Sequence, residues 1–157
     1  MTDADDRWLA RAVALATENV AGGGGPFGAV VVLDDAEVAA GANDVTGGID
    51  PTAHAEVVAI RRACRALGTH SLAGATLYAS CEPCPMCLSA ALWARVDRLV
   101  FAADRRDAAA AGFDDSLFYD LLSGARQDWP TALVPLRIDV APEPFAAWQA
   151  SGNRREY

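Results

Sequence analysis

The sequence contains no lysine, and all 13 of its basic residues are arginine. Lysine Schiff-base catalysis is therefore excluded. The sequence also lacks the run of about 20 apolar residues that a transmembrane helix needs. Its first six residues, MTDADD, are acidic, whereas a secretory signal peptide begins with positive charge. We therefore expect a cytoplasmic protein that does not bind membranes.

An excess of positive charge is missing as well. The chain carries 21 acidic residues against 13 arginines, which gives a net charge of −8. Proteins that grip nucleic acids usually present a basic face, so we expect no nucleic-acid partner. Cysteine is scarce too, at four residues. In a cytoplasmic protein we expect these cysteines to be metal ligands and not to form disulfides. Cys64 would be a buried cysteine that binds no metal.

What is present describes one globular domain, residues 1–157. The hydrophobic content of 52% and the charged content of 22% are ordinary for a folded protein with a full core. Apolar periodicity and Gly or Pro breaks predict helices at 5–20, 51–67, 87–94, 116–122 and 144–150, and strands at 29–33, 37–41, 75–79, 99–102 and 136–140. Residues 104–115 read as a long loop, and 151–157 as a polar tail.

This alternation of strands and helices predicts an α/β fold, a three-layer α/β/α sandwich around a five-stranded mixed sheet. The strand at 75–79 leads directly to a cysteine-bearing loop and then to a helix. Open α/β sheets place ligands at the carboxyl ends of their strands, so we expect the functional site there. We also expect Asp50 to cap the helix at 51–67, with Pro51 as its first residue and His54 in its first turns.

Two short segments carry the chemistry. His54-Ala55-Glu56 and Pro83-Cys84-Pro85-Met86-Cys87 supply one imidazole, two thiols and a carboxylate. Three such nitrogen and sulfur ligands leave the fourth position of a tetrahedral zinc open for water, as catalytic sites require. Bound zinc lowers the pKa of its water to about 7, and a nearby carboxylate such as Glu56 can move the protons. We predict one catalytic zinc per chain.

Spacing alone leaves other interpretations open. Cys81, Cys84 and Cys87 are evenly spaced, so with His54 they also fit a closed structural Cys3His site. A redox Cys-x-x-Cys is a further alternative. The histidine-x-glutamate element favours the catalytic interpretation, because a purely structural zinc site has no use for Glu56.

The order H-x-E followed by P-C-x-x-C is the signature of zinc-dependent nucleobase deaminases. Further stretches make the chain resemble the small bacterial guanine deaminases within the cytidine/deoxycytidylate-deaminase-like superfamily. The resemblance runs nearly end to end. The stretches are Gly25-Pro26-Phe27-Gly28-Ala29-Val30, Asn43-Asp44-Val45-Thr46, Trp93-Ala94-Arg95, Ala111-Gly112-Phe113-Asp114-Asp115-Ser116 and Glu156-Tyr157.

The resemblance implies roles for individual residues. His54, Cys84 and Cys87 would hold zinc, Glu56 and Asp115 would carry protons, and the base would contact Phe27, Asn43, Asp115 and Tyr157. Three of these positions have a structural alternative. Asn43 is also a typical turn residue, and Phe27 could belong to the core. Either Asp114 or Asp115 could be the N-cap of the helix that follows. Trp93 reads as a core residue or a subunit contact.

The function implied is hydrolytic deamination of guanine to xanthine and ammonia. Alternatives are another base or nucleoside, such as guanosine, cytosine or an ammeline-type triazine. A tRNA adenosine deaminase or a non-catalytic zinc-stabilised module are more remote. The resemblance also implies a homodimer in which residues 141–157 are exchanged between subunits, so that Tyr157 of one chain closes the other chain's site.

Overall fold

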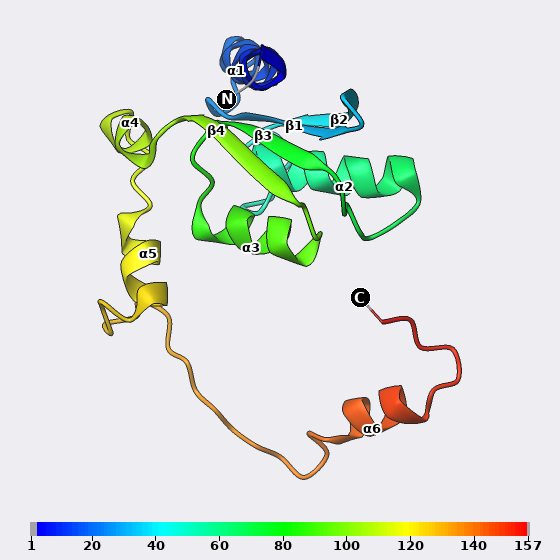
Figure 1. The fold of residues 1–157 in the computed structure, drawn as a ribbon. Helices are drawn as coiled ribbons and strands as arrows, with labels where there is room; N and C mark the ends of the chain where they lie inside the picture. Colours follow the sequence, from blue (N-terminus) through cyan, green and yellow to red (C-terminus); the bar gives the residue numbers. More distant parts are fainter. Residues whose placement is uncertain (1–2, 157) are drawn as a thin grey trace. The chain divides into compact units, whose positions relative to one another are not determined.

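The computed structural model describes residues 3–156 and divides the chain into two compact units, Met1–Tyr119 and Asp120–Tyr157. The first unit contains a four-stranded sheet with the strand order β2-β1-β3-β4 (Figure 1). The strands are β1 Gly28–Leu33, β2 Ala36–Ala42, β3 Thr76–Cys81 and β4 Arg98–Ala103. Strand β1 is antiparallel to β2 and β3, whereas β3 and β4 are parallel, so the sheet is mixed as predicted.

Helices cover both faces of this sheet, which confirms the three-layer arrangement (Figure 1). Helix α1, Asp3–Ala21, lies on one face, and α2, Ala55–Leu67, and α3, Pro85–Trp93, lie on the other. Alternate residues of β1 face the two layers: Ala29 and Val31 belong to the core cluster with α2, and Val30 to the cluster with α1. Burial on both faces explains why β1 reads as a continuous apolar run.

Two glycines allow the helices to approach the sheet closely. A Cβ atom at Gly28 would collide with the Ala12 carbonyl oxygen of α1, and one at Gly41 would collide with the Ala55 carbonyl oxygen of α2. Helix α2 therefore sits directly against the end of β2. This contact positions the start of α2, which carries His54 and Glu56, beside the sheet.

The structure corrects three predictions. Residues 136–140 form no strand, and the sheet has four strands instead of five. These residues belong to the second unit, whose described part includes helix α6, Glu143–Ala150, and holds no strand with which they could pair. Residues 104–115 are not all loop, because they contain α4, Arg105–Ala110, closed by a reciprocal capping box between Asp104 and Asp107.

The third correction concerns α2, which begins at Ala55 with His54 as its N-cap. The Asp50 carboxylate instead accepts hydrogen bonds from the backbone N–H and the hydroxyl of Thr52, at 2.8 and 2.7 Å. Asp50 therefore closes a local turn before the helix. The short helix predicted at 116–122 is confirmed as α5, Ser116–Ser123.

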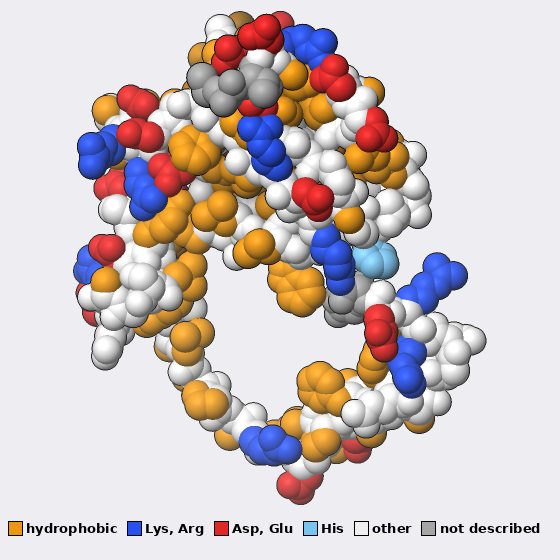
Figure 2. Space-filling view, viewed as in Figure 1, with side chains coloured by type: hydrophobic (Ala, Val, Ile, Leu, Met, Phe, Trp, Pro, Cys, Tyr) orange, Lys and Arg blue, Asp and Glu red, His pale blue; other side chains and the backbone are white. Residues whose placement is uncertain are grey.

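Charged side chains of both signs are interspersed on the face shown in Figure 2. Several charged residues of the first unit pair, as in Arg7–Asp35 at 2.7 Å and Arg11–Glu37 at 3.3 Å. That face presents no broad single-sign basic surface of the kind that polyanion-binding proteins use. No helix within residues 3–156 combines the length and the apolar character that crossing a bilayer demands.

The strands have two functionally different ends. Gly28, Ala42, Cys81 and Ala103 lie at one end, which we call the cavity end, and Leu33, Ala36, Thr76 and Arg98 lie at the far end. At the far end Asp5 of α1 is only 1% exposed. Its carboxylate pairs with the Arg98 guanidinium at 2.6 and 2.9 Å and accepts the Tyr78 hydroxyl at 2.9 Å. This network ties α1 to β3 and β4.

We expect Arg98→Met to lower the melting temperature by about 5–10 °C, because it removes the Arg98 ion pair of a buried carboxylate. Any activity at the cavity end should change little at moderate temperature, since the network lies at the far end of the sheet. Differential scanning calorimetry measures the first effect. Arg7→Met is the matched control, because it removes an exposed ion pair and should barely shift the transition.

Candidate active site and metal centre

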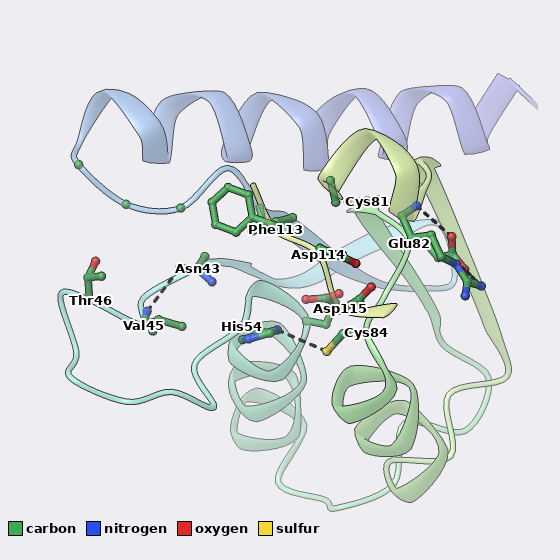
Figure 3. Close-up of a pocket in the computed structure, with 17 residues that line it drawn as sticks. Asn43, Val45, Thr46, His54, Cys81, Glu82, Cys84, Phe113, Asp114 and Asp115 are labelled. Atoms are coloured by element: carbon green, nitrogen blue, oxygen red, sulfur yellow. Dashed lines mark hydrogen bonds and ion pairs between the residues drawn. The ribbon is translucent and has the colours of Figure 1, made fainter. Parts of the chain in front are cut away.

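A cavity of about 500 Å³ opens at the cavity end of the sheet. Five segments of the first unit line it: the glycine loop before β1, the turn after β2, the start of α2, the loop after β3, and the stretch from α4 to α5 (Figure 3). Segments far apart in the sequence thus contribute to one space. The predicted residues Phe27, Asn43, His54, Glu56, Cys84 and Asp115 all line it.

Three potential metal ligands converge beside this cavity. His54 is the N-cap of α2, Cys84 is the N-cap of α3, and Cys87 lies in the first turn of α3. Their ligand atoms all lie within 4.8 Å of one another. The His54 Nδ1 atom is 3.6 Å from the Cys84 sulfur and 3.5 Å from the Cys87 sulfur. A tetrahedral zinc with ordinary Zn–N and Zn–S bonds separates such atoms by about 3.5 Å, so the donor set fits zinc.

The two thiols are electrostatically prepared for a cation. Hydrogen bonding from the Cys87 thiol, with a further contribution from His54, lowers the pKa of Cys84 to about 4. The same hydrogen bond, together with burial, raises the pKa of Cys87. Both cysteines lie at the N-terminal end of α3, where the helix dipole favours negative charge. A metal binds cysteine as thiolate, so metal binding would release the protons that these thiols still carry.

Cys81 behaves differently. Its thiol donates to the Asp104 carbonyl oxygen at 3.6 Å, and burial raises its pKa to about 11. Among the described residues it is not part of the three-ligand group. This geometry favours the open, catalytic ligand set over the closed Cys3His site.

Glu56 is a buried carboxyl group in the first turn of α2, with 7% of its surface exposed. Burial raises its pKa, and it contacts the Cys87 thiol. A carboxyl group whose pKa is raised holds a proton more readily, as a general acid–base group must. Its position in the cavity wall suits proton transfer beside the ligand cluster.

Asn43 and Phe27 serve the fold and the cavity together. The Asn43 side-chain oxygen accepts the Val45 N–H at 3.4 Å, as a turn residue does, and the residue also lines the cavity. The Phe27 ring meets the Phe113 ring edge to face, with centroids 5.0 Å apart, and also packs against the core. The structural and the ligand-facing interpretations are therefore compatible at both positions.

The two neighbouring aspartates have separate environments. The Asp114 carboxylate accepts the Ser116 N–H at 2.9 Å, and this bond lowers its pKa. Burial, with the nearby Cys84 charge, raises the pKa of Asp115. Figure 3 shows the Asp115 carboxylate next to His54 and Cys84. Asp114 therefore closes a local turn just before α5, whereas Asp115 lines the cavity.

Sequence reasoning missed several supporting residues. Asn19, near the end of α1, donates to the carbonyl oxygens of Gly25 and Asn43, both at 2.8 Å, and so joins two walls of the cavity. Glu82 and Arg105 line the cavity and pair at 2.6 Å. These contacts join segments far apart in the sequence, and no local pattern announces them.

Three other predictions have mixed outcomes. Trp93 is 67% exposed in the chain, so the core interpretation is wrong and a subunit contact remains a prediction. Cys64 is only half-buried, although burial does raise its pKa. Tyr157 lies outside the described residues, and its expected role is therefore untested.

Comparison with known proteins agrees with this geometry. Residues 2–103 match the zinc-binding region of the cytidine and deoxycytidylate deaminases. Guanine deaminase from Bacillus subtilis is 49% identical over 97% of this chain and 98% of its own length. The crystal structure of a B. subtilis guanine deaminase matches with a TM-score of 0.93 at 47% identity, covering 100% of this chain and 99% of that one.

A more distant structure, the guanine deaminase from Nitrosomonas europaea, has a TM-score of 0.65 at 38% identity, over 69% of this chain and 63% of that chain. The matched zinc-binding region contains all three converging ligands and Glu56. The nearly full-length relative extends the agreement to the segments that carry Asp115 and the C-terminal unit. The chain therefore belongs to the zinc-dependent cytidine and deoxycytidylate deaminase family, in the group that contains the guanine deaminase of Bacillus subtilis.

Proposed function

We propose that the protein is a zinc-dependent hydrolase that converts guanine and water to xanthine and ammonia. The observation that carries the proposal is one cavity that joins a three-ligand zinc site to a buried carboxylate, in a chain similar to a guanine deaminase over nearly its whole length. His54, Cys84 and Cys87 would hold the metal. When bound, zinc lowers the pKa of a coordinated water to about 7 and so supplies hydroxide at neutral pH.

The chain's own groups would move the protons. Oxygen adds to C2 of guanine, the carbon that bears the amino group, and Glu56 accepts the proton of the attacking water. Glu56 then returns this proton to a ring nitrogen. The added oxygen still carries one proton. As the bond from C2 to the amino nitrogen breaks, a carboxylate takes this proton and passes it to the departing nitrogen, so that the C2=O bond forms and ammonia leaves. Asp115, whose pKa burial also raises, would assist this second transfer.

Recognition of the base would fall to the cavity walls. The Asn43 amide offers both a donor and an acceptor to a purine edge, although its oxygen also holds the turn. The Phe27 ring, supported by Phe113, offers a flat apolar surface for stacking. A site built to hydrogen-bond the amino, N–H and O6 groups of guanine rejects bases that leave its buried polar atoms unpaired.

The direct test is ammonia release from a panel containing guanine, guanosine, adenine, cytosine and ammeline. We expect guanine to be turned over well ahead of the others. A clear preference for cytosine or guanosine would reassign the substrate within the same chemistry. Absence of release from every compound would instead support a non-catalytic zinc-stabilised module. A tRNA substrate is disfavoured by the net charge of −8, and cytoplasmic location remains a prediction from the sequence.

We also infer a homodimer that exchanges C-terminal segments. Strand β4 is one of the two outer strands of the sheet, so one side of its backbone is available to a further strand. Leu136, Ile138 and Val140 alternate in the sequence, are exposed, and form no strand within their own unit. A second copy of the chain is a low-cost source of the missing fifth strand, because exchange of an identical segment needs no new interface chemistry.

In such a dimer the tail would reach the partner's site, with Tyr157 covering the base. Deleting residues 151–157 should leave zinc content and melting temperature nearly unchanged and lower guanine turnover by about 10²-fold, since the site would lose the element that excludes water. Steady-state kinetics and elemental analysis provide these values. Mixing the truncated chain with Glu56→Gln should restore part of the activity, because hybrid dimers join an intact zinc site to an intact tail. Normal turnover by the truncated chain would argue for a frayed end.

A further inference from the structure

The segment that carries Asp115 is held at two points outside its own helix. Before it, the Phe113 ring packs edge to face on Phe27, with an interplanar angle of 87°. After it, the Tyr119 hydroxyl donates to the Pro83 carbonyl oxygen at 2.7 Å. Pro83 directly precedes the first cysteine of the ligand group, so this second contact joins α5 to the metal-bearing loop.

The ring of Tyr119 is fixed as well as its hydroxyl. The Arg105 guanidinium lies 4.1 Å from the ring centroid, within the range of a cation–π contact. Arg105 in turn donates to Glu82, through its Nε at 3.1 Å and its Nη2 at 2.6 Å, and its backbone N–H donates to the second carboxylate oxygen at 3.1 Å. Tyr119 therefore connects the first turn of α5 to Pro83 and to Arg105, the first residue of α4. Arg105 extends this connection to Glu82.

Tyr119 remains a donor under ordinary conditions. Burial raises the pKa of its phenol to about 12, so the hydroxyl keeps its proton at neutral pH. The hydrogen bond from this neutral phenol to a carbonyl oxygen therefore does not depend on pH near neutrality. The contact is a fixed structural link in the range where the enzyme would work.

The position of Asp115 depends on such links. Helix α5 has eight residues, too few for a stable helix in isolation, so external contacts must set its position. Asp115 and Tyr119 are four residues apart, which places them on the same side of the first turn, and the Asp115 carbonyl oxygen accepts the Tyr119 N–H at 3.5 Å. The Asp114 carboxylate accepts the Ser116 N–H, whereas the Asp115 carboxylate faces the ligand cluster (Figure 3).

We propose that Tyr119 is a positioning residue for deamination, which holds the Asp115 carboxylate over the reacting base by docking the first turn of α5 onto the Pro83 carbonyl. The inference rests on the proposed role of Asp115 in proton transfer. Loss of the hydroxyl would allow the first turn of α5 to move, and misplacement of a catalytic group by about 1 Å can cost 10²-fold in rate.

Two substitutions separate the contributions of the hydroxyl and the ring. Tyr119→Phe keeps the surface beneath Arg105 and removes only the hydrogen bond; we expect kcat to fall about tenfold, with KM much less affected. Tyr119→Leu removes both contacts and should lower kcat by about 10²-fold. Ser123→Ala is the matched control, because it removes another hydroxyl-to-carbonyl bond of α5, to the Asp120 oxygen, and should leave kcat unchanged.

A merely structural or metal-holding role makes different predictions. For Tyr119→Phe we expect zinc content, the rate of zinc transfer to a chromophoric chelator and the melting temperature to stay near those of the unaltered protein. A kcat that falls only in proportion to lost zinc or lost folded protein would overturn the inference. Recovery of part of the activity on going from Leu to Phe would support it.

A double-mutant cycle with Asp115→Asn is decisive. If Tyr119 acts through Asp115, adding Tyr119→Phe to Asp115→Asn should lower kcat by less than about twofold further. If the full tenfold loss persists, Tyr119 acts elsewhere and the inference is wrong. Normal turnover by Asp115→Asn would also overturn it, while guanine deamination itself would stand, because ammonia release by the unaltered protein tests that function separately.

Discussion

Replacing Glu56 with glutamine should reduce guanine turnover by roughly 10²–10⁴-fold, the contribution expected of a positioned general acid–base group. Glutamine preserves the size and most of the hydrogen bonding of this buried side chain but cannot carry a proton. Because Glu56 is not among the three ligands, zinc content should remain at about one per chain. Ammonia release under saturating guanine and elemental analysis together report both quantities.

Glu18→Gln provides the matched comparison, since Glu18 is an exposed glutamate of α1. It should leave turnover and zinc content unaltered. If Glu56→Gln keeps near-normal turnover, the proton carrier must be sought among the other cavity carboxyls. If it loses zinc, the residue contributes to holding the metal, and the ligand set described above is incomplete.

The second large effect should come from the cysteines. Cys84→Ser replaces a soft thiolate ligand by a hydroxyl, and we expect both zinc content and turnover to fall to near zero. Cys81→Ser should retain about one zinc per chain and most of the turnover, because serine can still donate toward the Asp104 carbonyl oxygen. The same pair of variants distinguishes an open three-ligand site from a closed Cys3His site.

Thermal unfolding offers an independent measurement of the same assignment. A metal that binds only the folded state stabilises it by mass action, so a chelator should lower the melting temperature of the unaltered protein and of Cys81→Ser. Cys84→Ser, having little metal to lose, should respond weakly. Equal loss of zinc from both variants would show that Cys81 is a ligand after all.

The ligand cluster could be predicted from the sequence because its members lie close together in two short segments. His54 and Glu56 are two residues apart, and Cys84 and Cys87 are three apart, so local spacing limits their geometry. The buried strand at residues 28–33 was also predictable, since burial on both faces leaves a continuous apolar run.

Contacts that depend on distant segments were not predictable in this way. The bond from Tyr119 to Pro83 spans 36 residues, and that from Asn19 to Asn43 spans 24. A single sequence contains no periodicity that pairs such positions. The strand predicted at 136–140 is wrong for a related reason. Alternating apolar residues indicate that a segment could form a half-buried strand, but they do not show whether a neighbouring strand is available to pair with it.

The separation of the two ends of the sheet has a consequence for engineering this scaffold. The cavity, the ligands and the cavity-lining side chains lie at one end, whereas the Asp5–Arg98–Tyr78 network and the Asp34-Asp35 turn lie at the other. Both turn residues adopt positive φ angles, which glycine and asparagine tolerate better than aspartate. Thermostability can therefore be raised at the far end, and substrate range altered at the cavity end, with little of the usual trade-off between stability and activity.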